Sequence, residues 1–119
     1  MSVSIVVMDG TLGRAAEGMH VTLSREVDRE WRWEGGGPIG EGGVLVPVEP
    51  VARGRYRLLV DLDRYYPPLG TEPFLSQAEV VFRVFRPGER VRLLVTVTPA
   101  ALFVTTQIDG LSTVHPKRE

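Results

Sequence analysis

The sequence predicts an all-β protein, folded as an eight-stranded sandwich of two sheets with one short helix. Thirteen glycines and nine prolines interrupt the chain at short intervals, as turn residues do. Between them run short segments in which apolar and polar residues alternate, which is the period of a half-buried strand. Eight such segments within 119 residues fit a single sandwich domain.

The segments follow one another along the whole chain, and the longest alternate most clearly. In residues 90–98, for example, Val91, Leu93, Val95 and Val97 share one face. One stretch, residues 63–70, has room for a helical turn, which the prolines at 67 and 68 would end early. The predicted strands are residues 2–9, 20–25, 31–34, 44–48, 55–61, 78–85, 90–98 and 102–108.

The predicted core consists of the side chains that point between the two sheets. We expect residues 1–109 to form the sandwich, and the polar residues 110–119 to form a loose tail. The predicted core residues are Val3, Ile5, Val7, Val21, Leu23, Tyr56, Leu58, Val60, Val80, Phe82, Val84, Leu93, Val95, Leu102 and Val104.

Composition excludes several classes of function. The net charge of −1 gives no basic excess for binding nucleic acid. The absence of cysteine excludes disulfides, thiolate metal sites and a cysteine nucleophile. No apolar run approaches the length of a membrane span. We therefore expect a soluble, cytoplasmic protein that binds neither nucleic acid nor membranes.

Some predicted strands also carry apolar residues on the face opposite the core. Val6 and Met8 do so in the first strand, Leu94 in the seventh and Phe103 in the last. One interpretation is that these are scattered surface residues, which are normal in soluble proteins. The other is that another subunit covers this second face.

The polar residues form no catalytic constellation. His20 begins a strand and His115 lies in the predicted tail, where an imidazole is usually a surface group. Asp61 and Asp63 share a strand face, but we expect them to lead out of the sheet into solvent. No His, Asp or Glu cluster has the spacing of a metal site.

The glycine-rich and aromatic motifs favour structural roles. Asp9-Gly10 is typical of a turn. The Gly-Gly-Gly-Pro run at 35–38 lacks the lysine of a phosphate loop and predicts a hairpin loop between strands. Trp31 and Trp33 alternate with arginines, as in nucleic-acid platforms, but neighbouring acids favour a solvated edge strand.

Several segments between Ser4 and Ile108 occur in the order of a known family. They are residues 9–23 (DGTLGRAAEGMHVTL), 54–58 (GRYRL), Tyr65-Tyr66 with Gly70, Pro73-Phe74, 78–82 (AEVVF) and 93–99 (LLVTVTP). This ordered set resembles the transthyretin and 5-hydroxyisourate hydrolase family. The resemblance implies an eight-stranded sandwich with one short helix, which agrees with the strand count above.

The resemblance also implies loss of the family's enzymatic residues. Its hydrolases open the ring of 5-hydroxyisourate using two histidines, an arginine and a terminal Tyr-Arg-Gly-Ser. Those positions match Val6 and Arg92 for the histidines, Val44 for the arginine, and Thr-Thr-Gln-Ile at 105–108 for the terminus. A guanidinium stays protonated, so Arg92 cannot be the base that activates water. Transthyretin itself likewise lacks the catalytic set and binds a hydrophobic hormone in a channel through its tetramer.

The resemblance implies a homotetramer, a dimer of dimers that pairs edge strands near residues 78–85 and 102–108. Its channel-lining positions coincide with the second face given by alternation, together with Val44. We expect a small anionic or aromatic ligand there, and no catalytic residue, metal or cofactor. The candidate ligand-binding residues are Val6, Met8, Val44, Arg92, Leu94, Thr96, Phe103, Thr105 and Gln107.

Two other functions stay open at this point. A divergent 5-hydroxyisourate hydrolase of purine catabolism would use the cationic Arg92 where the substrate would lie. A scaffold for other proteins of the urate pathway would need no site at all. The main expectation is a pseudoenzyme that binds a small ligand or serves a structural role.

Overall fold

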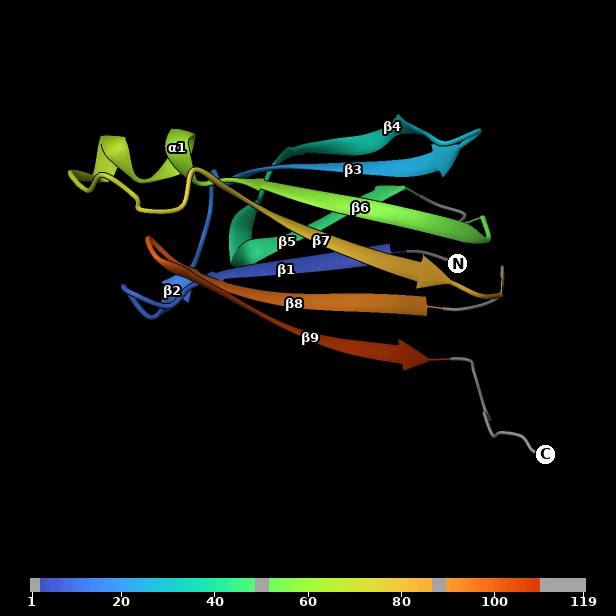
Figure 1. The fold of residues 1–119 in the computed structure, drawn as a ribbon. Helices are drawn as coiled ribbons and strands as arrows, with labels where there is room; N and C mark the ends of the chain where they lie inside the picture. The colour runs from blue at the N-terminus through green and yellow to red at the C-terminus, as the bar shows by residue number, and fades with distance from the viewer. Residues whose placement is uncertain (1–2, 49–51, 87–89, 110–119) are drawn as a thin grey trace.

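The protein is a sandwich of two β-sheets. The computed structural model describes residues 3–48, 52–86 and 90–109, and Figure 1 shows the two layers with the helical segment at one end. One sheet has the strand order β2-β1-β8-β9, with β5 also paired to β1, and the other has the order β4-β3-β6-β7. Strands β1 and β8 are parallel, while the other pairs are antiparallel.

Each of the eight predicted strands is present, and one more was not predicted. The addition is β2, whose two residues are too few to show alternation. The strands are β1 Val3–Asp9, β2 Arg14–Ala15, β3 His20–Val27, β4 Glu30–Pro38, β5 Val44–Val48, β6 Gly54–Asp61, β7 Gln77–Val84, β8 Arg90–Thr98 and β9 Ala101–Asp109. The helical segments are η1 Glu41–Gly43, α1 Leu62–Tyr65 and η2 Pro67–Leu69.

The predicted core lies between the sheets. The predicted core residues on β1, β3, β6 and β8 are buried, and so is Val84 on β7. Val80, Phe82, Leu102 and Val104 are partly buried and pack against the core; they lie on β7 and β9, which end their sheets and are covered on one side only. The prediction omitted further buried residues: Ala16, Met19, Ile39, Leu62, Tyr66, Val91 and Val97.

The prediction of a hairpin loop at the Gly-Gly-Gly-Pro run was wrong. These four residues form the end of β4 and pair with β3, from Leu23 opposite Gly35 to His20 opposite Pro38. A Cβ atom on Gly36 would lie 2.5 Å from the carbonyl oxygen of Val21. The glycine is therefore needed for close approach of two strands rather than for a turn.

The helical segment is held at the end of the sandwich by a buried carboxylate. Asp9, fully buried, accepts hydrogen bonds from the Thr11 and Leu12 amides at 2.9 and 3.1 Å, which confirms the predicted turn. It also accepts from the hydroxyls of Tyr65 at 3.0 Å and Tyr66 at 3.4 Å. Burial, together with the Asp9 carboxylate, raises the pKa of both tyrosines to about 12.

The two aspartates at 61 and 63 stabilise the helix start. Asp61 caps α1 by accepting from the Arg64 amide at 3.1 Å, and Asp63 accepts from the hydroxyl of Ser76. Asp63 is exposed, as predicted, whereas Asp61 is partly buried. Helix α1 ends before Pro67, as the proline pair predicts.

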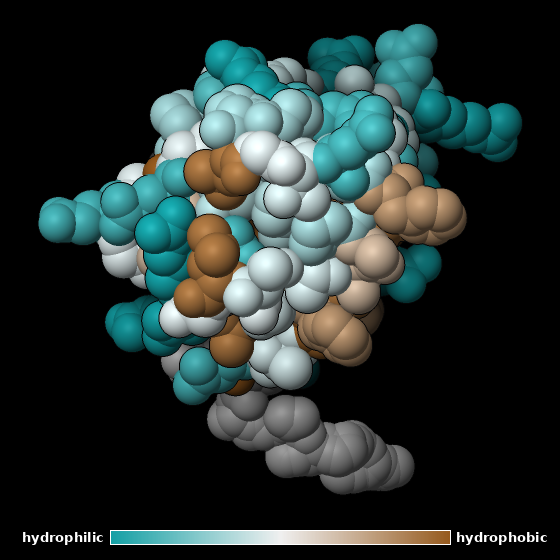
Figure 2. All heavy atoms as spheres, turned by 90° about the vertical axis from the view of Figure 1, so that its left-hand side faces the viewer, coloured by the Kyte–Doolittle hydropathy of each residue, from teal (hydrophilic) through white to brown (hydrophobic). Residues whose placement is uncertain are grey.

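The end of the sandwich around α1 carries apolar side chains that are not part of the core. Leu12, Leu69 and Phe74 are among the exposed large hydrophobic residues. Figure 2 shows that the apolar residues on this end form separate patches between hydrophilic ones. Within the described ranges, no helix has the length and apolar character needed to cross a membrane.

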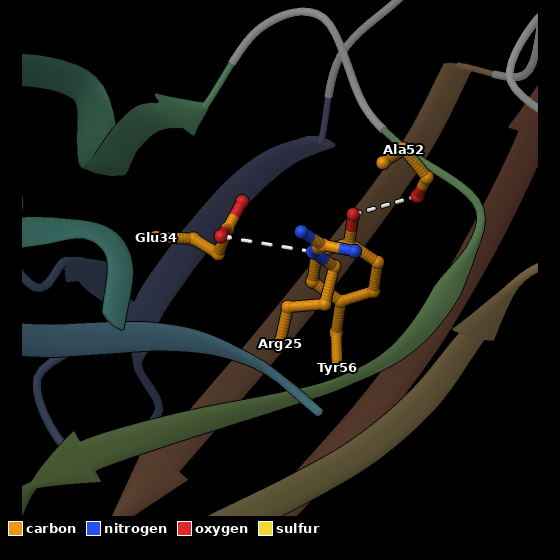
Figure 3. A network of polar contacts seen from close by, with 4 residues as sticks. All are labelled: Arg25, Glu34, Ala52 and Tyr56. Carbon is orange, nitrogen blue, oxygen red and sulfur yellow. Dashed lines mark hydrogen bonds and ion pairs between the residues drawn. The ribbon is translucent and has the colours of Figure 1, made fainter. Parts of the chain in front are cut away.

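A polar network fills the space between the sheets near the start of β6. Arg25 Nε lies 3.7 Å from Glu34 Oε2, and the Tyr56 hydroxyl donates to the Ala52 carbonyl at 2.6 Å (Figure 3). Burial raises the pKa of Tyr56 above its ordinary value. The tyrosine ring stacks on Phe82, with centroids 5.6 Å apart, so the network and the core meet here.

Candidate functional site

The nine residues predicted to bind a ligand lie together on the outer face of one sheet. Val44, Val6, Leu94 and Thr105 form a row across β5, β1, β8 and β9, since each is the register partner of the next. We call the surface formed by the nine residues the β8 face.

Two further rows complete the β8 face. Met8, Thr96 and Phe103 are register partners on one side of the central row, and Arg92 and Gln107 are partners on the other. Parallel pairing of β1 with β8 keeps their alternation in phase, so the residues that period-two alternation assigns to the second face do lie on one face of the sheet.

The β8 face is unusually apolar for a surface open to solvent. Phe103 is 63% exposed, and Leu94 and Val44 are each 41% exposed. Val6 is only 7% exposed because its neighbouring strands flank it on both sides. An exposed group of large apolar side chains is typical of a surface that is covered by a partner or a ligand.

Arg92 borders a shallow hollow of about 380 Å³ on this face. Its other lining residues are Leu94, Thr105, Thr106 and Gln107. Among the described side chains, no carboxylate forms an ion pair with Arg92, and Glu41 on η1 is exposed. The hollow therefore combines one guanidinium with hydroxyl and amide groups, a set that suits an anion or a polar ring.

The described side chains of the β8 face include no histidine and no carboxylate. His20, in contrast, begins β3 in the other sheet, and His115 lies outside the described residues. General-base activation of water needs a group that can accept a proton near neutral pH. Nor do the described residues contain a group of three His, Cys, Asp or Glu placed to hold a metal ion.

A second hollow, of about 390 Å³, lies on the outer face of the other sheet and was not predicted. Its lining residues include Gly36 and Gly37, together with His20, Thr22, Trp33 and Arg64. The carboxylate of Asp61, which also lines it, is already engaged as the α1 cap. The sequence signal for this hollow is the glycine run at 35–37, which was predicted to be a loop and forms part of β4 instead.

The relationship to known proteins agrees with this arrangement. A model of the HIUase/Transthyretin family matches residues 3–103. The chain belongs to this family. A solved structure of Klebsiella pneumoniae 5-hydroxyisourate hydrolase is similar in fold, with a TM-score of 0.78 and 22% sequence identity. The similarity covers 90% of this chain and 99% of that one.

Family membership confirms the resemblance and the transthyretin-like sandwich. Residues 3–103 include most of the β8 face and leave out Thr105 and Gln107 in β9. Binding of a ligand by the nine residues stays a prediction.

Proposed function

We propose that the protein is a non-catalytic member of the HIUase/Transthyretin family that acts in the cytoplasm as a homotetramer, a dimer of dimers. In this proposal the β8 face lines a channel between subunits that binds a small anionic or aromatic ligand or is structural. The observation that carries the proposal is the chemistry of the face: large exposed apolar residues with one cation and, among the described side chains, no imidazole or carboxylate.

The proposed tetramer is supported by two of the edge strands, β7 and β9, as well as by the β8 face. Strands β7 and β9 end their sheets, so each presents unpaired backbone groups along one side. Pairing with the same strand of a second copy would satisfy those groups and extend both sheets. Two such dimers stacked through their β8 faces would cover Leu94 and Phe103.

The competing proposal is a divergent 5-hydroxyisourate hydrolase, and Arg92 is the observation that favours it. A guanidinium beside the Thr105 and Gln107 side chains offers donors to an oxyanion that forms on a substrate. The Klebsiella pneumoniae protein of similar fold is named for that activity. No described residue on the β8 face, however, replaces the missing base.

A coupled assay separates the two proposals. Urate is oxidised enzymatically to 5-hydroxyisourate, and its decay is followed with and without the protein. We expect decay at the spontaneous rate. Stereoselective acceleration that is lost in Arg92→Ala would establish the hydrolase and overturn the non-catalytic proposal.

The ligand part of the proposal has its own test. Aromatic carboxylates should raise the melting temperature of the wild type by mass action, and Arg92→Ala should abolish the rise while keeping the tetramer. Arg32→Ala, which removes an exposed cation from β4, is the control and should respond as the wild type does. If no compound of a broad panel stabilises the wild type, the channel is structural.

A further inference from the structure

The end of the sandwich away from α1 carries a third hollow, of about 320 Å³. It forms where the start of β6 lies beside the end of β7 (Figure 1). Three of its lining residues are arginines on exposed positions, and an exposed Phe85 forms part of the wall. The lining residues are Arg53, Gly54, Arg55, Arg83, Val84 and Phe85.

The register of the two strands places like charges directly opposite each other. Arg55 on β6 is the register partner of Arg83 on β7, and Arg53 directly precedes β6. Directly opposed like charges destabilise a sheet unless another group compensates them. The whole chain has 15 acidic and 14 basic residues, so it contains enough carboxylates to neutralise its arginines.

The described carboxylates compensate only part of this charge. Arg55 Nη1 donates to Glu26 Oε2 at 3.0 Å, and its guanidinium also lies 5.5 Å from the centre of the Trp31 ring. Arg53 and Arg83 form no ion pair with any described residue. Two guanidinium groups at one hollow thus lack an acidic partner in the described part of the chain.

Another acid and cation near the hollow, Glu34 and Arg25, are paired with each other. Arg25 lies behind Gly54, since its Cδ would be 3.5 Å from a Cβ built there, and its charge is directed to Glu34. Figure 3 shows this pair between the sheets, with Tyr56 beside it. Glu34 therefore serves Arg25 and not the arginines of the hollow.

We propose that Arg53, Arg55 and Arg83 form a binding site for a compact oxyanion with at least two negative charges, such as a phosphate monoester or a small polycarboxylate. The planar fork of a guanidinium matches phosphate and carboxylate oxygens in pairs. Phe85 offers an apolar wall for the carbon part of the ligand. The site lies on β6 and β7, in the sheet opposite Arg92, so it does not depend on the proposed channel.

The test is the melting temperature in pyrophosphate, citrate and inorganic phosphate, each at an ionic strength held constant with sodium chloride. We expect pyrophosphate and citrate to raise the melting temperature of the wild type with increasing concentration. Arg53→Gln and Arg83→Gln should each weaken binding about tenfold or more, as expected for a lost charge-assisted hydrogen bond. Arg32→Gln, which removes an exposed cation from β4, should respond as the wild type does.

Charge reversal at the cross-strand position gives a second, independent readout. Arg83→Glu puts a carboxylate opposite Arg55, so it should raise the melting temperature without any anion and abolish the response to pyrophosphate. A lower melting temperature for this variant would mean that an acidic side chain already neutralises the cluster. That result, or equal responses of Arg83→Gln and Arg32→Gln, overturns the site. Neither outcome alters the tests of the channel or the hydrolase.

Discussion

The outer faces of the two sheets have opposite characters, although both arise from strands with the same alternation. The β8 face exposes Leu94 and Phe103 and carries one cation, Arg92. The outer face of the other sheet, which we call the β6 face, is polar: Arg55 pairs with Glu26 and lies near the Trp31 ring. A face of polar and charged side chains is suited to solvent, whereas an apolar face gains free energy when it is covered.

The largest expected effect is on assembly, and it compares one leucine from each face. Leu94 on β8 and Leu59 on β6 both point outward from a central strand. In the proposed tetramer, Leu94→Asp buries a carboxylate without a partner at the subunit interface, so we expect a loss of tetramer in favour of smaller species. Light scattering at micromolar concentration measures the mass.

Leu59→Asp is the matched control, since Leu59 is partly exposed on the β6 face and lies outside the proposed interface. We expect it to keep the tetramer. Equal dissociation of both variants would show that the two faces do not differ in this way, and a monomeric wild type would defeat the tetramer itself.

The next largest effect compares the two sides of one strand. Leu93 is fully buried in the core, while its neighbour Leu94 lies on the β8 face. Leu93→Ala should lower the free energy of unfolding by about 2–5 kcal/mol, because it removes buried methyl groups and leaves a cavity. Denaturant titration measures the loss, and Leu94→Ala should cost much less when both are compared as monomers. Similar losses would mean that the register of β8 is wrong.

A smaller effect concerns the buried carboxylate that ties α1 to β1. Asp9→Asn keeps the shape of the side chain but replaces one accepting oxygen with a donor that faces other donors. We expect a loss of about 1–3 kcal/mol in the free energy of unfolding. Denaturant titration at neutral pH gives the value, and an unchanged stability would contradict the network.

The same cluster predicts a loss of stability at high pH. The pKa of Tyr65 and of Tyr66 rises from 10.0 to about 12 in the folded protein. Folding therefore favours the neutral tyrosines, and their contribution is complete below pH 10.0 and is lost as the pH rises through about 12. Tyrosinate absorbance follows the titration, and Tyr66→Phe removes one of the two high-pH steps. Titration of these tyrosines near pH 10.0 would contradict the burial of the cluster.

The strands and eight residues of the β8 face could be predicted because both follow from period-two alternation, whereas Val44 was predicted from the family resemblance. Prediction failed where another constraint decided the structure. The glycines of β4 look like a loop in sequence, but Gly36 is required by the close approach of Val21. The bonds from Tyr65 and Tyr66 to Asp9 join residues more than 50 positions apart, and the pairing of Arg55 with Arg83 depends on a register that alternation does not define.

The smallest expected effect probes why the β6 face tolerates its aromatic residues. The guanidinium of Arg57 lies 4.8 Å from the centre of the Trp31 ring, close enough for a cation–π contact. Trp31→Leu should lower the free energy of unfolding by about 0.5–1 kcal/mol beyond the loss of apolar area. Trp33→Leu is the control, because no arginine in the described residues lies over its exposed ring. A double-mutant cycle with Arg57→Met isolates the pairwise energy, and a coupling of zero would mean that the ring does not stabilise the Arg57 guanidinium.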